Sequence, residues 1–481
     1  MRFFFRDFIF GFFLVGFLWA GTPTLYGADP RQMKFDPVDF DPPKADRIVL
    51  PKGMILYFLE DHTLPLVNIQ LMIKTGDIYD PPDKVGVAGL TGAVMRRGGT
   101  LNKSSDAIDE ELEFMAAELN IGIEQERGTA NLNLLRKDLD QGLTLFADIL
   151  MHPAFEEGKL ELTKRGVIEG ILRRNDSPHS IAARTFQKLV YGELHPYGRE
   201  STVESIQRIQ REDLLAFHRN FFRPNNVLIA VSGDIKKDEL IRKLTEVFSP
   251  WQEKEVVFPP VPPVHQEVNP SINYIFKDIP QTTIRMGHLG VKRDNPDFFA
   301  LSVMDDILGS GGFGSRLFQE VRTRQGLAYS AGSIFQPGDF EVGIFLAYSE
   351  TKSASTLQAI NAILNEIKRI REEAVSDEEL KQAKDSFLNS FVFSFANPTQ
   401  IVTRQMRLEY MGLPKDFLDT FRDRVAQVTK KDILRVAQQY LKPEGLIILA
   451  VGKQDEFDSP LSTLGKVHEI PLEETEPVTG G

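Results

Sequence analysis

The sequence of 481 residues contains no cysteine. Disulfides, thiolate metal sites and cysteine nucleophiles are therefore excluded. Histidine is also scarce, with eight residues, and no two of them lie closer than 16 positions apart. No helix can then present two histidines to one metal ion. Any metal site would need histidines and carboxylates from distant parts of the chain.

An excess of positive charge is absent as well. Lysine and arginine total 56 against 68 aspartate and glutamate residues, which gives a formal net charge of -12. Without a basic stretch to neutralise a phosphate backbone, nucleic acid is not expected as a partner. The chain is 42% hydrophobic, so at this length it can bury the cores of more than one domain.

Long hydrophobic runs are missing after the first 20 residues. Residues 8–20 form an unbroken apolar or glycine run of 13, preceded by Arg2 and Arg6. This pattern is typical of an export signal and is too short to span a bilayer comfortably. We expect a signal peptide over residues 1–28, a periplasmic or secreted protein, and no membrane span in the mature chain. The alternative is an uncleaved anchor, because residues 21–28 are a poor cleavage site.

An internal repeat organises the remaining chain. Nine residues between positions 206 and 233 each match an identical or similar residue 219 positions later, and the alignment needs no gap. Each copy predicts a helix that opens at aspartate, a turn at proline and a buried strand that ends at glycine. The matching pairs are Ile206 and Val425, Ile209 and Val428, Asp213 and Asp432, Leu214 and Ile433, Leu215 and Leu434, Pro224 and Pro443, Val227 and Leu446, Ile229 and Ile448, and Gly233 and Gly452.

The repeat predicts two tandem homologous domains of class α+β. Each is expected to be an antiparallel sheet with helices packed on one face. Alternating patterns predict strands such as residues 66–73 and 283–290, and the helical period predicts a helix over residues 354–373. The predicted boundaries are 46–255 for the first domain, 256–268 for a proline-rich linker, 269–455 for the second domain and 456–481 for a poorly ordered acidic tail.

Several motifs resemble the insulinase or pitrilysin (M16) family of zinc peptidases, in its two-domain bacterial and mitochondrial-processing branch. They are residues 86–95 (Gly-Val-Ala-Gly-Leu-Thr-Gly-Ala-Val-Met), residues 195–198 (His-Pro-Tyr-Gly) and residues 315–329, which begin Ser-Arg-Leu-Phe. The resemblance covers nearly the whole mature chain. It implies the insulinase-like, or LuxS-metallohydrolase-like, fold.

The resemblance also implies that the catalytic zinc site is lost. Members that cut peptides carry His-x-x-Glu-His on a helix and a more distant glutamate as third ligand. The corresponding positions here are Gly89, Ala93 and Gly170 for the ligands and Gly92 for the general base. None of these offers a donor atom, so no catalytic residue, metal ligand or cofactor is expected in this chain.

A substitute metal site remains the alternative within the first half. His195 with Glu169 or Glu200 would be the candidate set, and Glu169 directly precedes the third ligand position. Adjacent residues on a helix point about 100° apart, so the Glu169 carboxylate would point away from the direction of the third ligand. The stretch of residues 309–314, Gly-Ser-Gly-Gly-Phe-Gly, lacks the lysine of a phosphate loop and is interpreted as a flexible turn.

The second half keeps the family's other feature. By resemblance, Arg322 and Tyr329 are the arginine and tyrosine that hold the substrate's scissile peptide opposite the zinc. A guanidinium and a phenol suit this task, because both can donate hydrogen bonds to a carbonyl oxygen that gains negative charge. Arg316 and Arg324 flank the pair and are weaker candidates.

The resemblance therefore implies a non-catalytic subunit of a heteromeric zinc endopeptidase. A homologous subunit would supply the zinc and the general base, and Arg322 and Tyr329 would clamp an extended peptide. The enzyme class of this chain stays open, since alone it is expected to be inactive. Alternatives are a structural scaffold subunit and a peptide-binding protein of the same fold with no role in cleavage.

Overall fold

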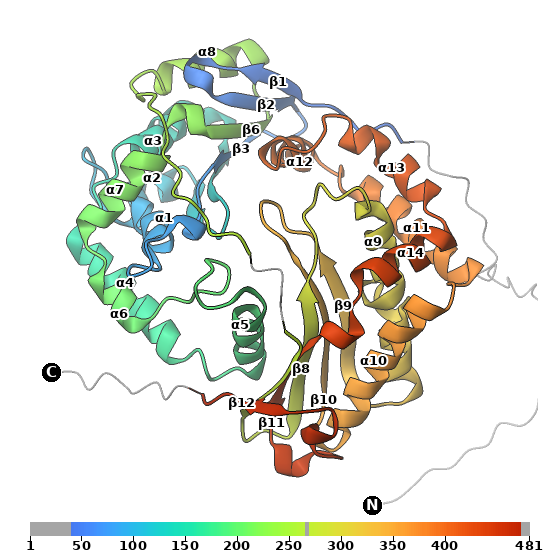
Figure 1. Ribbon diagram of the computed structural model, residues 1–481. Helices are drawn as coiled ribbons and strands as arrows, with labels where there is room; N and C mark the ends of the chain where they lie inside the picture. The colour runs from blue at the N-terminus through green and yellow to red at the C-terminus, as the bar shows by residue number, and fades with distance from the viewer. Residues whose placement is uncertain (1–39, 265–268, 473–481) are drawn as a thin grey trace, which may run out of the picture. The chain divides into compact units, whose positions relative to one another are not determined.

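The computed structural model describes residues 40–264 and 269–472. The predicted signal peptide, residues 1–28, lies outside the described residues. The described chain contains two sheets of six strands (Figure 1). In spatial order, the first sheet consists of β1 (Asp46–Val49), β2 (Ile55–Glu60), β6 (Val227–Gly233), β3 (Leu66–Ile73), β5 (Gly128–Leu135) and β4 (Glu118–Ile123). The second consists of β12 (Val467–Glu469), β7 (Ser271–Phe276), β11 (Ile447–Gly452), β8 (Gln281–Leu289), β10 (Ile344–Lys352) and β9 (Ala328–Gln336).

The two sheets share one topology from the second strand to the sixth, which confirms the predicted pair of homologous α+β domains. Most strand pairs are antiparallel, as expected. In each sheet the second and third strands form a parallel pair, β2 with β6 and β7 with β11, and β12 adds a second parallel pair to the second sheet. The central strands β6 and β11 are buried along their whole length. Their continuous apolar sequences suit strands that are covered on both faces.

Helices follow the strands in both halves. Those of the first half are α1 (Val87–Arg97), α2 (Ser105–Phe114), α3 (Leu139–Met151), α4 (Glu157–Leu172), α5 (Pro178–Tyr191), α6 (Val203–Arg208), α7 (Arg211–Phe221) and α8 (Lys237–Val247). Those of the second half are α9 (Phe298–Asp305), α10 (Thr356–Glu372), α11 (Asp377–Phe393), α12 (Pro398–Tyr410), α13 (Phe417–Gln427) and α14 (Lys430–Tyr440). Helix α14 repeats α7 at the predicted step of 219 residues.

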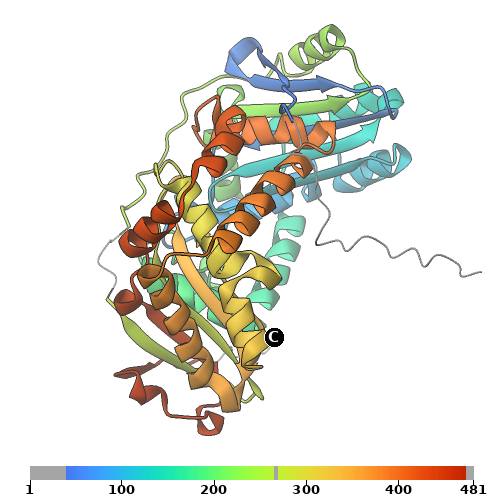
Figure 2. The same cartoon turned by 90° about the vertical axis from the view of Figure 1, so that its right-hand side faces the viewer.

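The two halves exchange a helix. Helix α5 of the first half packs on β8 and β11 of the second sheet, and α12 of the second half packs on β2 and β6 of the first (Figures 1 and 2). Both begin with proline at the first helical position after a side-chain cap, Ser177 or Asn397. Helices of its own half cover one face of each sheet, as predicted, and the exchanged helix covers the other face.

Two buried clusters hold the exchanged helices in place. Val402, Met406 and Tyr410 of α12 pack against Tyr57 and neighbouring side chains of the first sheet. A larger cluster joins α5 to the second sheet; its helix residues are Ile181, Ala182, Phe186, Val190 and Tyr191, and its strand residues are Ile275, Leu346, Ile447, Leu449 and Val451. Burial of this apolar surface couples the two halves.

The expected poorly ordered tail is wrong for residues 456–472. Leu461 is fully buried, and β12 pairs with β7 at the edge of the second sheet. The alternating apolar positions Ile470 and Leu472 pack against the cluster under α5. Residues 251–264 form neither helix nor strand, and Phe258 packs against the ring of Tyr79 at 5.5 Å between centroids.

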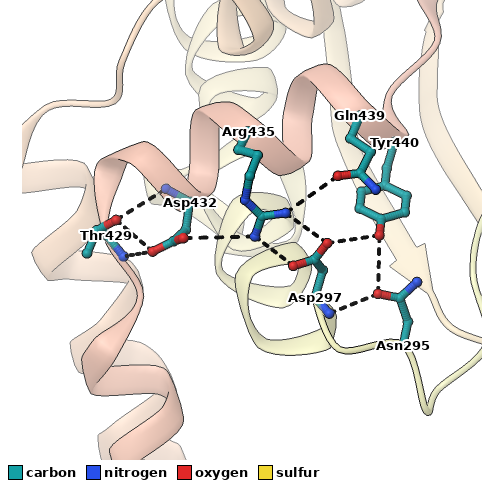
Figure 3. A network of polar contacts seen from close by, with 7 residues as sticks. All are labelled: Asn295, Asp297, Thr429, Asp432, Arg435, Gln439 and Tyr440. Atoms are coloured by element: carbon teal, nitrogen blue, oxygen red, sulfur yellow. Dashed lines mark hydrogen bonds and ion pairs between the residues drawn. The ribbon is translucent and has the colours of Figure 1, made fainter.

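A polar network ties the second half's helices together (Figure 3). Asp297, which precedes α9, accepts hydrogen bonds from both terminal nitrogens of Arg435 at 2.9 and 2.6 Å and from the hydroxyl of Tyr440 at 2.9 Å. Arg435 and Tyr440 both lie on α14. The charge-assisted pair fixes the start of α9, which leads directly into the segment that carries Arg322.

Candidate functional site

The three positions of the lost zinc ligands lie on neighbouring helices. Gly89 and Ala93 are on α1, and Gly170 is on α4, which packs against α1. Gly89 and Gly170 both line a cavity of about 440 Å³. A Cβ atom built on either glycine would meet no other atom within 4 Å. The cavity therefore occupies the space into which the ligand side chains would project.

Gly92, at the position of the general base, is in a different situation. A Cβ atom here would lie 2.8 Å from the backbone nitrogen of Ile123 on β4 and 3.1 Å from the carbonyl carbon of Gly122. Strand β4 thus packs directly against the backbone of α1. A glutamate has no room at this position unless β4 moves, so the site is closed sterically as well as chemically.

Two aspartates of the cavity wall have perturbed acidity. Asp80 accepts hydrogen bonds from the backbone nitrogens of Gly86 at 2.7 Å and Ala88 at 3.0 Å, at the start of α1. Burial raises the pKa of Asp80 to about 7, and burial likewise raises the pKa of Asp77 to about 6. Both groups thus bind a proton more tightly than an exposed aspartate does.

Three arginines line the same cavity. Arg174 and Arg184 both contact the carboxylate of Glu200, at 3.3 and 2.8 Å. Arg199 donates to the backbone carbonyl of Asp80 at 3.2 Å. Its buried Nε atom has no hydrogen-bond partner among the described residues.

The proposed substitute zinc set does not assemble. Glu200 is engaged by two guanidinium groups, and Glu169 is exposed and lies 3.6 Å from Arg173. His195 is buried, with its ring stacked on Tyr191 at 5.8 Å. Within residues 40–264 and 269–472, no three histidine, aspartate or glutamate side chains are placed to hold a metal ion. The residues present do not fit zinc.

The structure brings Arg322 and Tyr329 together. Arg322 lies on the π-helical segment η8 (Phe318–Arg324), and Tyr329 is the second residue of β9. The Arg322 guanidinium carbon is 4.7 Å from the centroid of the Tyr329 ring and 4.8 Å from that of Phe318. Cation–π attraction to these two rings holds the guanidinium group of Arg322 in place. The wide turn of a π-helix is itself frequent at functional sites.

The pair is accessible. Tyr329 is 76% exposed, and the nearby Phe313, whose centroid is 5.9 Å from the guanidinium carbon of Arg322, is 74% exposed. Strand β9 is the outer strand of its sheet. Its second half is covered, because the backbone nitrogen of Phe335 donates to Asp305 of α9 at 2.9 Å and Gly309 packs against the backbone of Ser333. Its first residues, beginning with Ala328 and Tyr329, adjoin this aromatic surface at the sheet edge. An extended peptide can bind such an edge through backbone hydrogen bonds.

The flanking arginines have structural partners. Arg316 is buried and forms a bidentate pair with Glu379 of α11, at 2.6 and 3.1 Å. Arg324 contacts Glu320 on its own turn at 2.8 Å. The residues 309–314, expected as a flexible turn, form π-helical and 3₁₀ turns that continue α9. Arg316 therefore anchors the segment that presents Arg322.

Sequence reasoning missed two parts of this site. One is the cavity wall of Asp77, Asp80 and Arg199, which comes from separate loops and has no common motif. The other is the aromatic surround of Arg322. A signal for the latter is present in the sequence, since Phe318 precedes Arg322 by four residues and lies on the same turn.

Comparisons with known proteins agree with this geometry. Residues 57–193 match the family described as insulinase (peptidase family M16), and residues 208–387 match the peptidase M16 inactive domain. The non-peptidase homolog YmxG of Helicobacter pylori is 25% identical over 379 residues, which cover 78% of this chain and 86% of that protein. An uncharacterized zinc protease of Rickettsia bellii is 26% identical over 329 residues, which cover 67% of this chain and 78% of that protein.

A solved structure shows the same fold. The crystal structure of a peptidase M16 inactive domain from Pseudomonas fluorescens has a TM-score of 0.78 and 26% identity, and the match covers 85% of this chain and 98% of that one. The two family matches together span most of the described chain. The chain belongs to the insulinase (M16) peptidase family and is a homologue of the inactive, non-peptidase kind.

Proposed function

We propose that this chain is the non-catalytic subunit of a heteromeric M16-type zinc endopeptidase. A homologous subunit with an intact His-x-x-Glu-His motif supplies the zinc and the general base. Arg322 and Tyr329 of this chain hold the substrate carbonyl and stabilise the negative charge that develops on its oxygen. The observation that carries the proposal is the contrast between the stacked, exposed Arg322–Tyr329 pair and the glycines at the zinc positions.

The peptide is proposed to bind in extended form at the sheet edge beside Tyr329, at the start of β9. Backbone hydrogen bonds to the edge give affinity without a strict sequence requirement. Tyr329 is on this strand, and Arg322 contacts its ring, so both side chains adjoin a peptide bound there. A periplasmic or secreted location is part of the proposal. No helix of the described residues is long and apolar enough to cross a bilayer.

The test compares this chain alone with this chain plus a zinc-bearing M16 homologue from the same genome. Alone, it is expected to carry no stoichiometric zinc and to cleave no peptide. The pair is expected to cleave, and Arg322→Ala or Tyr329→Phe should lower kcat about 100-fold without weakening assembly. Arg324→Ala is the matched control, because Arg324 lies on the same turn but pairs with Glu320.

The outcomes separate the competing roles. Chelator-sensitive cleavage by the purified single chain would contradict the inactive assignment. An unchanged kcat of the pair with Arg322→Ala would rule out the clamp role and favour a structural scaffold subunit. Tight binding of peptides by the single chain, with no stimulation of the partner, would favour a peptide-binding protein.

A further inference from the structure

A cavity of about 350 Å³ lies between the start of the described chain and the helices α12 and α13. It shares no lining residue with the cavity at the lost zinc positions, and neither Arg322 nor Tyr329 lines it. Its volume is within the range of small-molecule sites, about 300 to 1,000 Å³. We call it the arm cavity, because the segment of residues 42–47, the arm, forms one of its walls.

The arm is held against α12 by polar contacts (Figure 1). Arg47 donates to both carboxylate oxygens of Glu409 at 2.6 and 2.7 Å. The side-chain amide of Gln405 accepts from the backbone nitrogen of Ala45 at 3.1 Å and donates to the carbonyl of Pro43 at 2.9 Å. The arm is therefore fixed at three positions, so a ligand that binds in the cavity does not have to order this wall.

Most of the lining is apolar. Helix α12, the loop after it and the start of α13 each contribute a leucine, and β2 contributes the ring of Tyr57, which is only 7% exposed. The other apolar lining residues are Pro42, Ala45, Leu408, Leu413, Pro414 and Leu418. Such a lining stabilises a ligand that buries hydrocarbon. Since a water-sized group takes about 30 Å³, the cavity has room for roughly ten carbon atoms.

The charged residues of the lining cancel except for one lysine. Lys44 pairs with Asp419 of α13 at 2.9 Å, and Glu409 is held by Arg47. Lys415 also lines the cavity, and within residues 40–264 and 269–472 its ammonium group forms no ion pair or hydrogen bond. The hydrogen bond from Arg47 lowers the pKa of Glu409, and the charge of Lys415 adds to this effect. The unbalanced charge at the cavity is therefore a single positive one.

One positive charge beside an apolar lining restricts the chemistry of a ligand. A dianion would be opposed by the carboxylates of Glu409 and Asp419, and a cation would be repelled by Lys415. A neutral hydrocarbon would leave the lysine unused. An unbranched monocarboxylate satisfies both parts of the site, because its chain removes apolar surface from water and its carboxylate pairs with the ammonium group.

We propose that the arm cavity binds a medium-chain fatty acid such as decanoate. The alkyl chain packs against Leu408, Leu413 and Leu418, and the carboxylate pairs with the exposed Lys415. Because the arm belongs to the first half of the chain and α12 to the second, the bound fatty acid contacts both halves. This binding does not depend on the clamp of Arg322 and Tyr329 or on cleavage by a partner subunit.

Isothermal titration of the chain with a homologous series tests the apolar part of the site. The probes are the sodium salts of hexanoate, octanoate, decanoate and dodecanoate, each kept below its micelle concentration. The dissociation constant is expected to fall about fourfold for each added methylene up to roughly ten carbons. Beyond that length it should stop falling, because the cavity is full.

Two variants separate the charge from the apolar lining. Lys415→Gln should weaken decanoate about fivefold and leave the neutral 1-decanol unchanged. Lys431→Gln is the matched control, because Lys431 is exposed on α14, forms no ion pair within the described chain and does not line the cavity. Leu413→Trp should weaken both ligands at least tenfold by filling the cavity. Each variant is compared only if its circular dichroism and melting temperature match those of the parent.

Any of four results would overturn the proposal. The first is the absence of decanoate binding at millimolar concentration, and the second is an affinity that does not rise with chain length. The third is decanoate binding that neither Lys415→Gln nor Leu413→Trp weakens, which would place the probe elsewhere on the molecule. The fourth is another occupant: binding that appears only after removal of residues 1–39 would assign the cavity to the chain's own N-terminal segment, and a dimer that decanoate dissociates would assign it to a second copy.

Discussion

At the scale of single residues, the glycines at the lost catalytic positions play opposite structural parts. Gly89 and Gly170 open a cavity, whereas Gly92 permits the close approach of α1 and β4. The same substitution at two of these positions should therefore have opposite effects on stability. This difference gives a matched pair of variants on one helix.

Gly92→Ala is expected to lower the free energy of unfolding by about 1 to 3 kcal/mol, because its Cβ would press on the backbone of β4. Gly89→Ala should raise it by about 0.5 to 1 kcal/mol, since alanine is the better helix former and meets no neighbour. Urea unfolding of both variants measures the difference. Equal effects would show that β4 does not pack on α1 as described.

Restoring the zinc motif is also constrained by Gly92. The chain with Gly89→His, Gly92→Glu, Ala93→His and Gly170→Glu should bind zinc poorly and fail to cleave peptides, because the new carboxylate side chain at position 92 would have no space beside Ile123. Zinc titration with a colorimetric chelator measures the affinity. Tight stoichiometric zinc together with cleavage would mean that loss of the side chains alone explains the inactivity.

The buried carboxyl group of Asp77 should make stability depend on pH. Its folded pKa is raised to about 6 from the ordinary 3.8, so its stabilising contribution is present below pH 3.8 and is lost as the pH rises through about 6. Asp77→Asn should raise the free energy of unfolding by about 1 to 2 kcal/mol at pH 8 and change it little at pH 4. Denaturant unfolding at both pH values measures this. An equal effect at pH 4 and pH 8 would contradict a buried Asp77 carboxyl group with a raised pKa.

At the scale of elements, the exchanged helix α12 depends on apolar contacts with the opposite half. Met406 is fully buried between α12 and the first sheet. Met406→Ala should lower the free energy of unfolding by about 2 to 5 kcal/mol through the cavity it leaves. Thr403→Ala, on the same helix and only partly buried, serves as control. Similar losses for both would argue against tight packing at Met406.

Much of this element structure is readable from the sequence. The strand over residues 66–73 is confirmed residue for residue as β3, and the helix expected over 354–373 is α10, Thr356–Glu372. The periodicity of a single amphipathic element is enough to find these. The helix exchange cannot be predicted from the sequence, because the apolar face of α12 has the same pattern whichever sheet it covers. Likewise, the closure at Gly92 depends on a contact with β4 that only the folded chain reveals.

At the scale of the whole molecule, the interlocked helices predict that the halves do not fold independently. A fragment of residues 40–264 would lack α12 and expose Tyr57, Met72 and Leu228 on the face of its sheet. It is expected to bind the dye ANS and to aggregate, and co-expression with residues 269–472 should suppress both effects. Calorimetry of the full chain should show one cooperative transition. Two separate transitions, or a monomeric dye-free fragment, would contradict the coupling.

The exchanged helix has a consequence for biosynthesis. About 165 residues separate the end of β6 at Gly233 from the start of α12 at Pro398, and at ribosomal speed this gap takes roughly 10 to 30 s. During that interval the nascent first half exposes an apolar face of its sheet, because α12, which covers this face in the folded chain, has not yet been synthesised. Such a chain would be a natural client of holdase chaperones, and the order of the two copies along the messenger determines how long that protection is needed.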